Sequence, residues 1–202
     1  KENILVNSTV IEDSEFLHGA KLVIQTLKGG TFRPNTLFLT LGKGTRNDDV
    51  INQLVKHTAK YKMGILLLYK YQSVGFGMQK DVNLWLRDES PNWHLAMLIA
   101  LQLQLNWQGK FNLITIAQKP EDVKRLNSFM ERLGDQVRLP SMSEFHVLVG
   151  DFKKLAETAP KADINIFGLR EELSFDFIRS GSKSSKSSCL FVRDSGQESA
   201  TV

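Results

Sequence analysis

The stretch VNLWLRDESPNWHLAMLIALQLQLNWQGKFNLITIA, from Val82 to Ala117, holds two short apolar runs on either side of a long apolar segment. The runs VNLWL and KFNLITIA have the length and composition of buried strands. Between them, Ser90 and Pro91 favour a helix start, because Ser is a good cap and Pro fits the first helical position. The stretch therefore predicts a strand–helix–strand unit whose two strands run parallel.

The same alternation continues on both sides of this unit. Apolar runs that predict further strands are TLFLTL at 36–41, GILLLYKY at 64–71, FHVLV at 145–149, DINIF at 163–167 and CLFV at 189–192, and helical patterns lie between most of them. Near-continuous apolar strands are typical of a sheet covered on both faces. We therefore expect one three-layer α/β domain over residues 1–202, with a mostly parallel sheet and crossover helices.

One segment breaks this pattern. SGSKSSKSS, at 180–188, is built almost entirely of Ser and Lys, and this composition predicts a solvated linker or mobile loop. Its serines could accept phosphate, which would add about −1.5 to −2 charge per site.

Composition and charge limit the classes of function. The chain has 202 residues, a formal net charge of +4 and 42% hydrophobic residues, which is typical of a folded globular chain. Its Lys and Arg residues form no dense stripe, so we do not expect a nucleic-acid partner. The single cysteine, Cys189, excludes a disulfide within the chain, and the four histidines lack metal-ligand spacing. No secretory signal is visible, which favours an intracellular chain.

The uncharged segment from Ser90 to Gly109 also needs testing as a membrane span. It contains several Asn and Gln residues, and its apolar centre, Leu95 to Leu101, is much shorter than the ~20 residues that cross a bilayer. The segment predicts a buried helix, and no transmembrane helix is expected in this chain.

The best candidate for a binding loop is Gly42-Lys43-Gly44-Thr45, which follows one predicted strand and precedes a helix. Anions bind at such places in α/β folds, because backbone N–H groups and the helix N-terminus attract negative charge. The order of residues differs from the GxxxxGK[ST] pattern of a phosphate-binding P-loop. The alternatives are a phosphate or nucleotide site at these four residues and a plain glycine-rich turn.

Other candidate motifs favour structural roles. Gly75-Phe76-Gly77 lacks the third glycine of a dinucleotide-binding fingerprint. Asp81, Asp88 and Glu89 flank a strand, and the last two precede a helix, where negative charge favours capping.

The C-terminal residues supply no nucleophile with a partner base. Asp194-Ser195-Gly196 lacks the GxSxG pattern of a nucleophile elbow, and Cys189 opens an apolar strand, as a buried thiol would. We therefore assign no catalytic residue, no metal ligand and no cofactor, and we expect a protein that is not an enzyme.

Several motifs in order resemble one family. GGTFRPNTLFL, then QSVGFGMQKDVNLWLRDESPNW, then KFNLITIAQ, then DINIFGL are similar to the C-terminal cytosolic domain of cation-chloride cotransporters, most of all to the prokaryotic members. The resemblance covers roughly Ser14 to Val202. It implies a fold like that of universal stress proteins. It also implies a non-catalytic regulatory and dimerisation domain, attached to a transmembrane transport domain at the cytoplasmic face of the membrane.

The resemblance also bears on whether and where this chain binds a nucleotide. Universal stress proteins that bind ATP carry a glycine-rich loop before the final strand, where this chain has SGSKSSKSS with Gly181 as its one glycine. ATP binding of that kind is therefore not expected. Some animal cotransporters hold a nucleotide near the loop that corresponds to Gly42–Arg46, so a site there stays open.

Two further expectations concern the ends and the dimer. Asn3–Val6 looks like a first strand, and from the resemblance we expect a segment of the family to be missing near residues 6–8. Phe175, Phe177 and Ile178 are candidates for a dimer interface, and they could equally be core residues.

The alternative to a cotransporter domain is a freestanding nucleotide-binding protein of the universal stress type. A small α/β enzyme is a third hypothesis.

Overall fold

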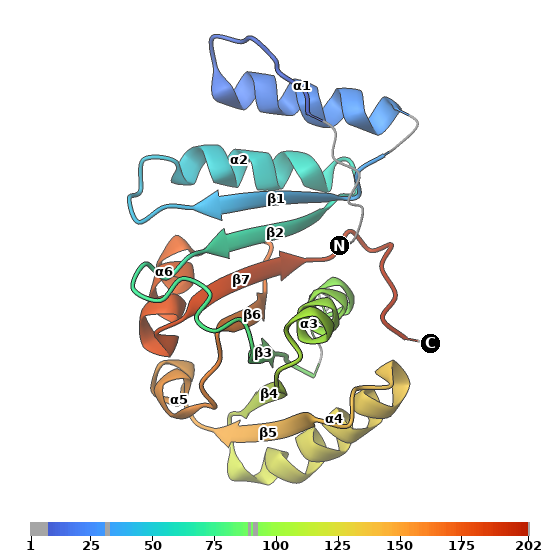
Figure 1. Cartoon of the computed structure of the whole chain (residues 1–202), viewed down its shortest axis with the longest axis vertical. Helices are drawn as coiled ribbons and strands as arrows, with labels where there is room; N and C mark the ends of the chain where they lie inside the picture. Colours follow the sequence, from blue (N-terminus) through green and yellow to red (C-terminus); the bar gives the residue numbers. More distant parts are fainter. Residues whose placement is uncertain (1–7, 31–32, 89, 91–92, 202) are drawn as a thin grey trace.

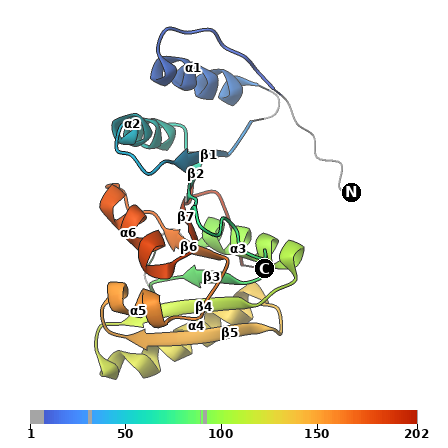
Figure 2. The same ribbon diagram turned by 60° about the vertical axis from the view of Figure 1, so that its left-hand side comes forward.

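The computed structural model describes residues 8–30, 33–88, 90 and 93–201, and within these residues seven strands form one sheet with helices on both faces (Figures 1 and 2). The strand expected at Asn3–Val6, the segment near 6–7, Glu89 and Pro91 lie outside the described residues. The strands are β1 (Thr36–Leu41), β2 (Gly64–Tyr69), β3 (Val82–Trp85), β4 (Phe111–Ala117), β5 (Ser143–Val149), β6 (Ile164–Gly168) and β7 (Ser188–Arg193). The helices are α1 (Phe16–Gly29), α2 (Asp48–Ala59), α3 (His94–Trp107), α4 (Val123–Val137), α5 (Phe152–Thr158) and α6 (Phe175–Ser185), with a 3₁₀ turn at Pro120–Asp122.

The strand order is β1-β2-β7-β6-β3-β4-β5. All neighbours run parallel except β2 and β7, which are antiparallel. The order therefore joins a parallel pair, β1 and β2, to a five-stranded parallel unit, β3 to β7. The expected three-layer α/β architecture with a mostly parallel sheet is confirmed.

The core has two sides, one for each face of the sheet. On one face, α3 and α4 bury residues such as Met97 and Met130 against Leu84 and Leu113. On the other face, α2, α5 and α6 cover a cluster that includes Ile65, Phe167 and Phe191. α1 packs outside α2, where Ile24 meets Leu54 and Met63 in a small third cluster. Figure 1 shows α1 beyond the β1 end of the sheet.

A ladder of three buried amides crosses the middle of the sheet. Asn165 of β6, Asn83 of β3 and Asn112 of β4 stand side by side in register. Asn112 Nδ2 donates to Asn83 Oδ1 at 2.8 Å, and Asn83 Nδ2 donates to Asn165 Oδ1 at 3.1 Å. Each of these side chains is almost completely buried, so an unpaired amide would carry the full cost of desolvation. A slip of one strand by one residue would break the ladder, which makes it a register lock.

Outer contacts complete the ladder. Asn165 Oδ1 also accepts from Trp85 Nε1 at 2.7 Å, and Asn165 Nδ2 donates to Ser187 Oγ at 2.6 Å. At the other end, Asn112 Oδ1 lies 3.3 Å from His146 Nε2 on β5. The network therefore reaches from the residue just before β7, through β6, β3 and β4, to the edge strand β5.

The loop between β2 and β3 is held by one carboxylate. Asp163 accepts hydrogen bonds from the backbone N–H groups of Met78, Lys80 and Asp81, at 2.8 to 3.0 Å. Gly77 has a φ of +55°, and a Cβ there would lie 1.9 Å from Asp163 Oδ1. Gly77, the second glycine of the GFG motif, is therefore required by close approach to this carboxylate. Asp163 and Asp81 have structural roles, since Asp81 Oδ1 accepts from Lys110 N at 3.0 Å.

The segment at 180–188 is not a loop. Residues 180–185 form the second half of α6, and β7 begins at Ser188. Ser174 Oγ accepts from Phe177 N and caps the helix, and the small residues Gly181 and Ser182 let its buried side approach the sheet. Packing overrides the coil preference of the serines here. Ser182, Ser187 and Ser188 are buried, which removes them as simple phosphate acceptors.

Of the three residues considered for a dimer interface, Ile178 is in the core, Phe175 is partly buried and Phe177 is 37% exposed. Ile178 is buried, and the ring of Phe177 packs against Phe152, Phe167 and Phe191. Phe175 is only partly buried and packs against the same cluster. Together with the 180–188 segment, these residues fix α6 on the sheet.

The start of α3 also differs from the prediction. The helix begins at His94, and Ser90 lies before it without being its cap. Asp194, which follows β7, accepts from the backbone N–H groups of His94 and Leu95 at 3.0 and 3.2 Å. Burial raises the pKa of this carboxyl group above its ordinary value. Asp88, expected to cap this helix, instead pairs with Arg125 of α4. A carboxylate from the far end of the chain therefore supplies the cap, which local spacing could not reveal.

The amide ladder predicts a large effect of a small substitution. Asn165→Ala would leave Trp85 Nε1 without its acceptor and would remove one of the two acceptors of Asn83 Nδ2, which keeps the carbonyl oxygen of Pro160 at 2.7 Å. We expect the free energy of unfolding to fall by about 3 kcal/mol. Asn127→Ala, at an exposed position of α4, is the matched control and should change it by less than about 0.5 kcal/mol. Urea unfolding followed by circular dichroism measures both. Equal effects of the two substitutions would contradict the role of the ladder.

Candidate functional site

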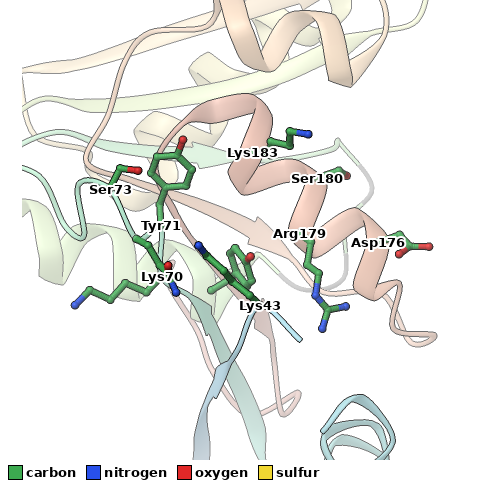
Figure 3. Close-up of a pocket in the computed structure, with 10 residues that line it drawn as sticks. Lys43, Lys70, Tyr71, Ser73, Asp176, Arg179, Ser180 and Lys183 are labelled. Atoms are coloured by element: carbon green, nitrogen blue, oxygen red, sulfur yellow. The ribbon is translucent and has the colours of Figure 1, made fainter. Parts of the chain in front are cut away.

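A basic hollow lies where β1 and β2 end and α6 passes above them (Figure 3). Its volume is about 600 Å³. The β1–α2 loop contributes Lys43, the end of β2 contributes Tyr69, and the chain after β2 contributes Lys70 and Tyr71. The remaining lining residues are Gln72 and Ser73 from that same segment and Asp176, Arg179, Ser180 and Lys183 from α6.

The α6 residues face the hollow because of their spacing. Positions 176, 179, 180 and 183 are separated by three and four residues, so they share one side of the helix. Figure 3 shows these side chains along α6, and it places Lys43 on the other wall, beside Lys70 and Tyr71. Four basic groups and one carboxylate line the space, so the hollow favours anions.

Arg179 is the structural anchor of the site. Its two terminal nitrogens donate to the carboxylate of Asp48, at the start of α2, at 2.9 and 2.7 Å. A further bond of 2.7 Å joins Arg179 Nη2 to the carbonyl oxygen of Gly44. The hydrogen bonds to Asp48 raise the pKa of Arg179 above its ordinary value. This bidentate pair ties the β1–α2 loop to α6, so the hollow has fixed walls on two sides.

The remaining cations are free for a ligand. Among the described residues, Lys43 and Lys183 form no ion pair, and Lys70 Nζ lies 5.9 Å from the centre of the Phe76 ring. Arg179 Nε is buried and has no hydrogen-bond partner among the described residues. Lys43, Lys70 and Lys183 therefore form a basic surface that can neutralise several negative charges of one ligand, next to an Arg179 that Asp48 already pairs with.

The four residues of the GKGT motif lie in different places relative to the hollow. The motif does lie between a strand and a helix, as predicted, but of its members only Lys43 lines the hollow. Gly44 turns its carbonyl toward Arg179, and Thr45 accepts from Asp48 N in a turn. Neither Gly42 nor Gly44 has a positive φ. A concave nest of N–H groups needs alternating left- and right-handed residues, so this loop offers a lysine rather than a backbone cradle.

The other candidate residues have structural partners. His18 pairs with Asp13, His57 contacts the ring of Tyr61, His94 Nδ1 accepts from Ala200 N, and His146 contacts Asn112. Ser195 Oγ accepts from Gln197 N in the turn after β7. Within the described residues, no three His, Cys, Asp or Glu side chains lie together in a way that could hold a metal ion.

Sequence reasoning found only one wall of the hollow. The sequence predicts a strand end and loop at Lys70–Ser73, with no binding role, and it predicts a linker that contains Ser180 and Lys183 and follows Arg179. The signal that could have found them is helical spacing: Phe175 and Ile178 are apolar, while Asp176, Arg179 and Lys183 share the polar side. That pattern is amphipathic, but its Ser-rich composition hides it.

The fold defines the class of protein. The mostly parallel seven-stranded sheet with its crossover helices is similar in fold to solved universal stress proteins. A universal stress protein from Archaeoglobus fulgidus DSM 4304 has a TM-score of 0.56 and 13% identity, covering 87% of this chain and 65% of its own. A putative universal stress protein from Pseudomonas aeruginosa UCBPP-PA14 has a TM-score of 0.53 and 10% identity, covering 91% and 70%. At these identities the likeness shows the fold alone.

The family follows from closer matches. Residues 1–76 match the family described as "Prokaryotic cation-chloride cotransporter, C-terminal domain, 1st", and residues 77–201 match the family described as its 2nd. A crystal structure of the cytoplasmic domain of a prokaryotic cation chloride cotransporter has a TM-score of 0.84 and 30% identity, covering 91% of this chain and 73% of its own. This chain belongs to the family of prokaryotic cation-chloride cotransporter C-terminal domains.

Two further findings complete the comparison. The search of curated proteins finds no significant match. Among the described residues, no helix has both the length and the apolar character needed to span a bilayer. The boundary between the two family regions, at 76/77, falls in the loop that Asp163 holds, and the antiparallel pairing of β2 with β7 joins both regions in one sheet.

The buried cysteine gives a reporter for this packing. Cys189 is fully buried in β7, as predicted, and burial raises the pKa of its thiol to about 12. At pH 8 only about one thiol in ten thousand would be ionised. We expect no reaction with Ellman's reagent in the native chain and one equivalent per chain in guanidinium chloride. Rapid labelling of the native chain would contradict this burial.

Proposed function

We propose that this chain is the cytoplasmic regulatory and dimerisation domain of a membrane cation-chloride cotransporter. The observation that carries the proposal is the match in fold and sequence to a cotransporter's cytoplasmic domain over 91% of the chain. In this proposal the chain is attached to a transmembrane transport domain at the cytoplasmic face of the membrane. It performs no catalysis, contains no ion path and has no nucleic-acid partner.

Regulation by such a domain has a simple physical requirement. A transporter alternates between states, and an attached domain shifts their populations only if it contacts those states with different free energies. The rigid features found here suit this role: the amide ladder locks the centre of the sheet, and the Arg179–Asp48 pair fixes α6 to α2. In a rigidly packed domain, a displacement at one surface also moves the other surfaces. A loosely packed domain would absorb that displacement by local rearrangement.

Removal of the domain tests the regulatory role. Full-length cotransporter and a variant that lacks this chain are reconstituted in liposomes, and uptake of labelled chloride is measured under the same ion gradients. We expect transport to persist in the variant with a rate changed by about five-fold or more, which is the usual size of allosteric coupling. Equal rates in the two preparations would contradict a regulatory role.

A second proposal concerns the basic hollow. Its lysines, its fixed arginine and its two tyrosines favour a polyphosphate anion, and a nucleotide could add a base against the tyrosine rings. Lys43 is the residue of the GKGT motif that points to this role. The alternative of a freestanding nucleotide-binding protein of the universal stress type would use the same surface.

Titration calorimetry with ATP and with inorganic tripolyphosphate tests the hollow. We expect Lys43→Ala to weaken binding about ten-fold, since loss of one charge contact of about 1.4 kcal/mol changes affinity by that factor. Lys124→Ala, at an exposed position of α4, is the matched control and should leave binding unchanged. Equal binding of both anions would indicate a phosphate site without base recognition. Equal effects of the two substitutions would overturn the assignment of the site.

A further inference from the structure

The segment that follows β7, residues 194–201, lies beside the start of α3 and is called the strap below (Figures 1 and 2). Its first residue, Asp194, caps the helix through the backbone N–H groups of His94 and Leu95. Six residues further on, Ala200 is only 6% exposed and belongs to the core cluster that also contains Leu95 and Met97. The strap is therefore attached to this part of the fold at two points.

The attachment at Ala200 depends on one histidine side chain. Nδ1 of His94 accepts a hydrogen bond from the backbone N–H group of Ala200 at 3.1 Å. Only a ring nitrogen that carries no proton can accept, so the bond requires the neutral ring with its proton on Nε2. The protonated ring has N–H groups at both nitrogens, so turning it over would not restore an acceptor. Protonation of His94 therefore removes this bond.

Two carboxylates of the strap act in the opposite direction. Asp194 interacts electrostatically with His94, and Glu198 interacts electrostatically with Asp194. Negative charge at this place stabilises a protonated imidazole ring, whereas the hydrogen bond from Ala200 stabilises the neutral ring. Each protonation state of His94 therefore has its own favourable partner.

The other elements packed against α3 add little charge. β3, β4 and β6 contain no charged residue, and β7 contributes only Arg193. The guanidinium group of Arg193 donates to the carbonyl oxygen of Val55 on α2, at 2.7 Å. In the segment before α3, Asp88 is paired with Arg125. Within α3 itself, His94 is the one ionisable residue of the sequence.

We propose that His94 is a pH-sensitive switch that holds the strap on α3 when the ring is neutral and releases it when the ring is protonated. Histidine is the side chain whose charge ordinarily changes between about pH 5 and pH 8. Because the neutral ring makes the bond, its contribution is present at high pH and is lost as the pH falls. On release, Ala200 leaves the core, while Asp194 keeps its bonds to the first turn of α3.

Nuclear magnetic resonance of the 202-residue chain tests the two groups that form the bond. At pH 8 we expect the Nε2–H tautomer of His94 and a backbone amide of Ala200 that is protected from hydrogen exchange. At pH 5.5 we expect the protection factor of this amide, corrected for the pH dependence of free exchange, to fall about five-fold or more, as the loss of one net hydrogen bond would give. An unchanged protection factor would overturn the proposal.

Two substitutions test His94 itself. His94→Asn places an amide oxygen, which accepts at either pH, close to the position of Nδ1, so Ala200 should stay protected at pH 8 and at pH 5.5. His94→Phe keeps a ring but supplies no acceptor, so protection should be low at both. The matched control is His18→Asn, because His18 is exposed and pairs with Asp13; it should keep the full pH dependence. Circular dichroism checks that each variant folds.

The competing cause of a pH effect is the titration of Asp194, since burial raises the pKa of its carboxyl group. In that case His94→Asn would lose protection at pH 5.5 as the unchanged chain does, and the switch would be overturned. Full protection in His94→Phe would overturn it as well. Protection that persists in His94→Asn and is low in His94→Phe supports the switch. The switch is a property of this chain alone, so neither result bears on attachment to a transport domain.

Discussion

The fold depends on a row of buried amides that must pair with one another. Asn165, Asn83 and Asn112 lie on three neighbouring strands, and each is removed from water. An amide in that position is stabilising only when its donors and acceptors are satisfied. Here the partners are the other amides, together with Trp85, Ser187, His146 and the carbonyl oxygen of Pro160. The centre of a parallel sheet is otherwise apolar and tolerates slippage, so this polar row selects one register among several.

The candidate surfaces follow from that register. β6 sets the position of β7, and β7 pairs antiparallel with β2, which carries β1 and α2 with it. The hollow forms because α6 then lies over the ends of β1 and β2, where Arg179 reaches Asp48. On the opposite face, the same sheet supports α3, whose first turn is capped by Asp194 at the end of β7. Two distant regions of the chain, matched by two family regions, therefore act as one body.

Much of the fold could be predicted from the sequence, because the apolar runs are long and alternate with helical patterns. The strands of the Val82–Ala117 unit, the parallel pairing and the burial of Cys189 all follow from such local patterns. The helix at 180–185 could not be predicted, because its serines favour coil locally and are helical only through packing on the sheet. The cap of α3 by Asp194 and the Arg179–Asp48 pair join residues far apart in the sequence, and spacing carries no information about them. Of the GKGT motif, Lys43 lines the hollow, whereas Gly42 and Gly44 have no positive φ and form no nest of N–H groups.

The central claim is that this domain works as part of a membrane transporter, and the native protein in its source cells tests that claim most directly. An antibody raised against the chain would be used on fractionated cells, with detection by size. The account predicts a band far above the 22.9 kDa of this chain, in the membrane fraction and released only by detergent. A soluble band near that mass would contradict it and would favour a freestanding protein of the universal stress type.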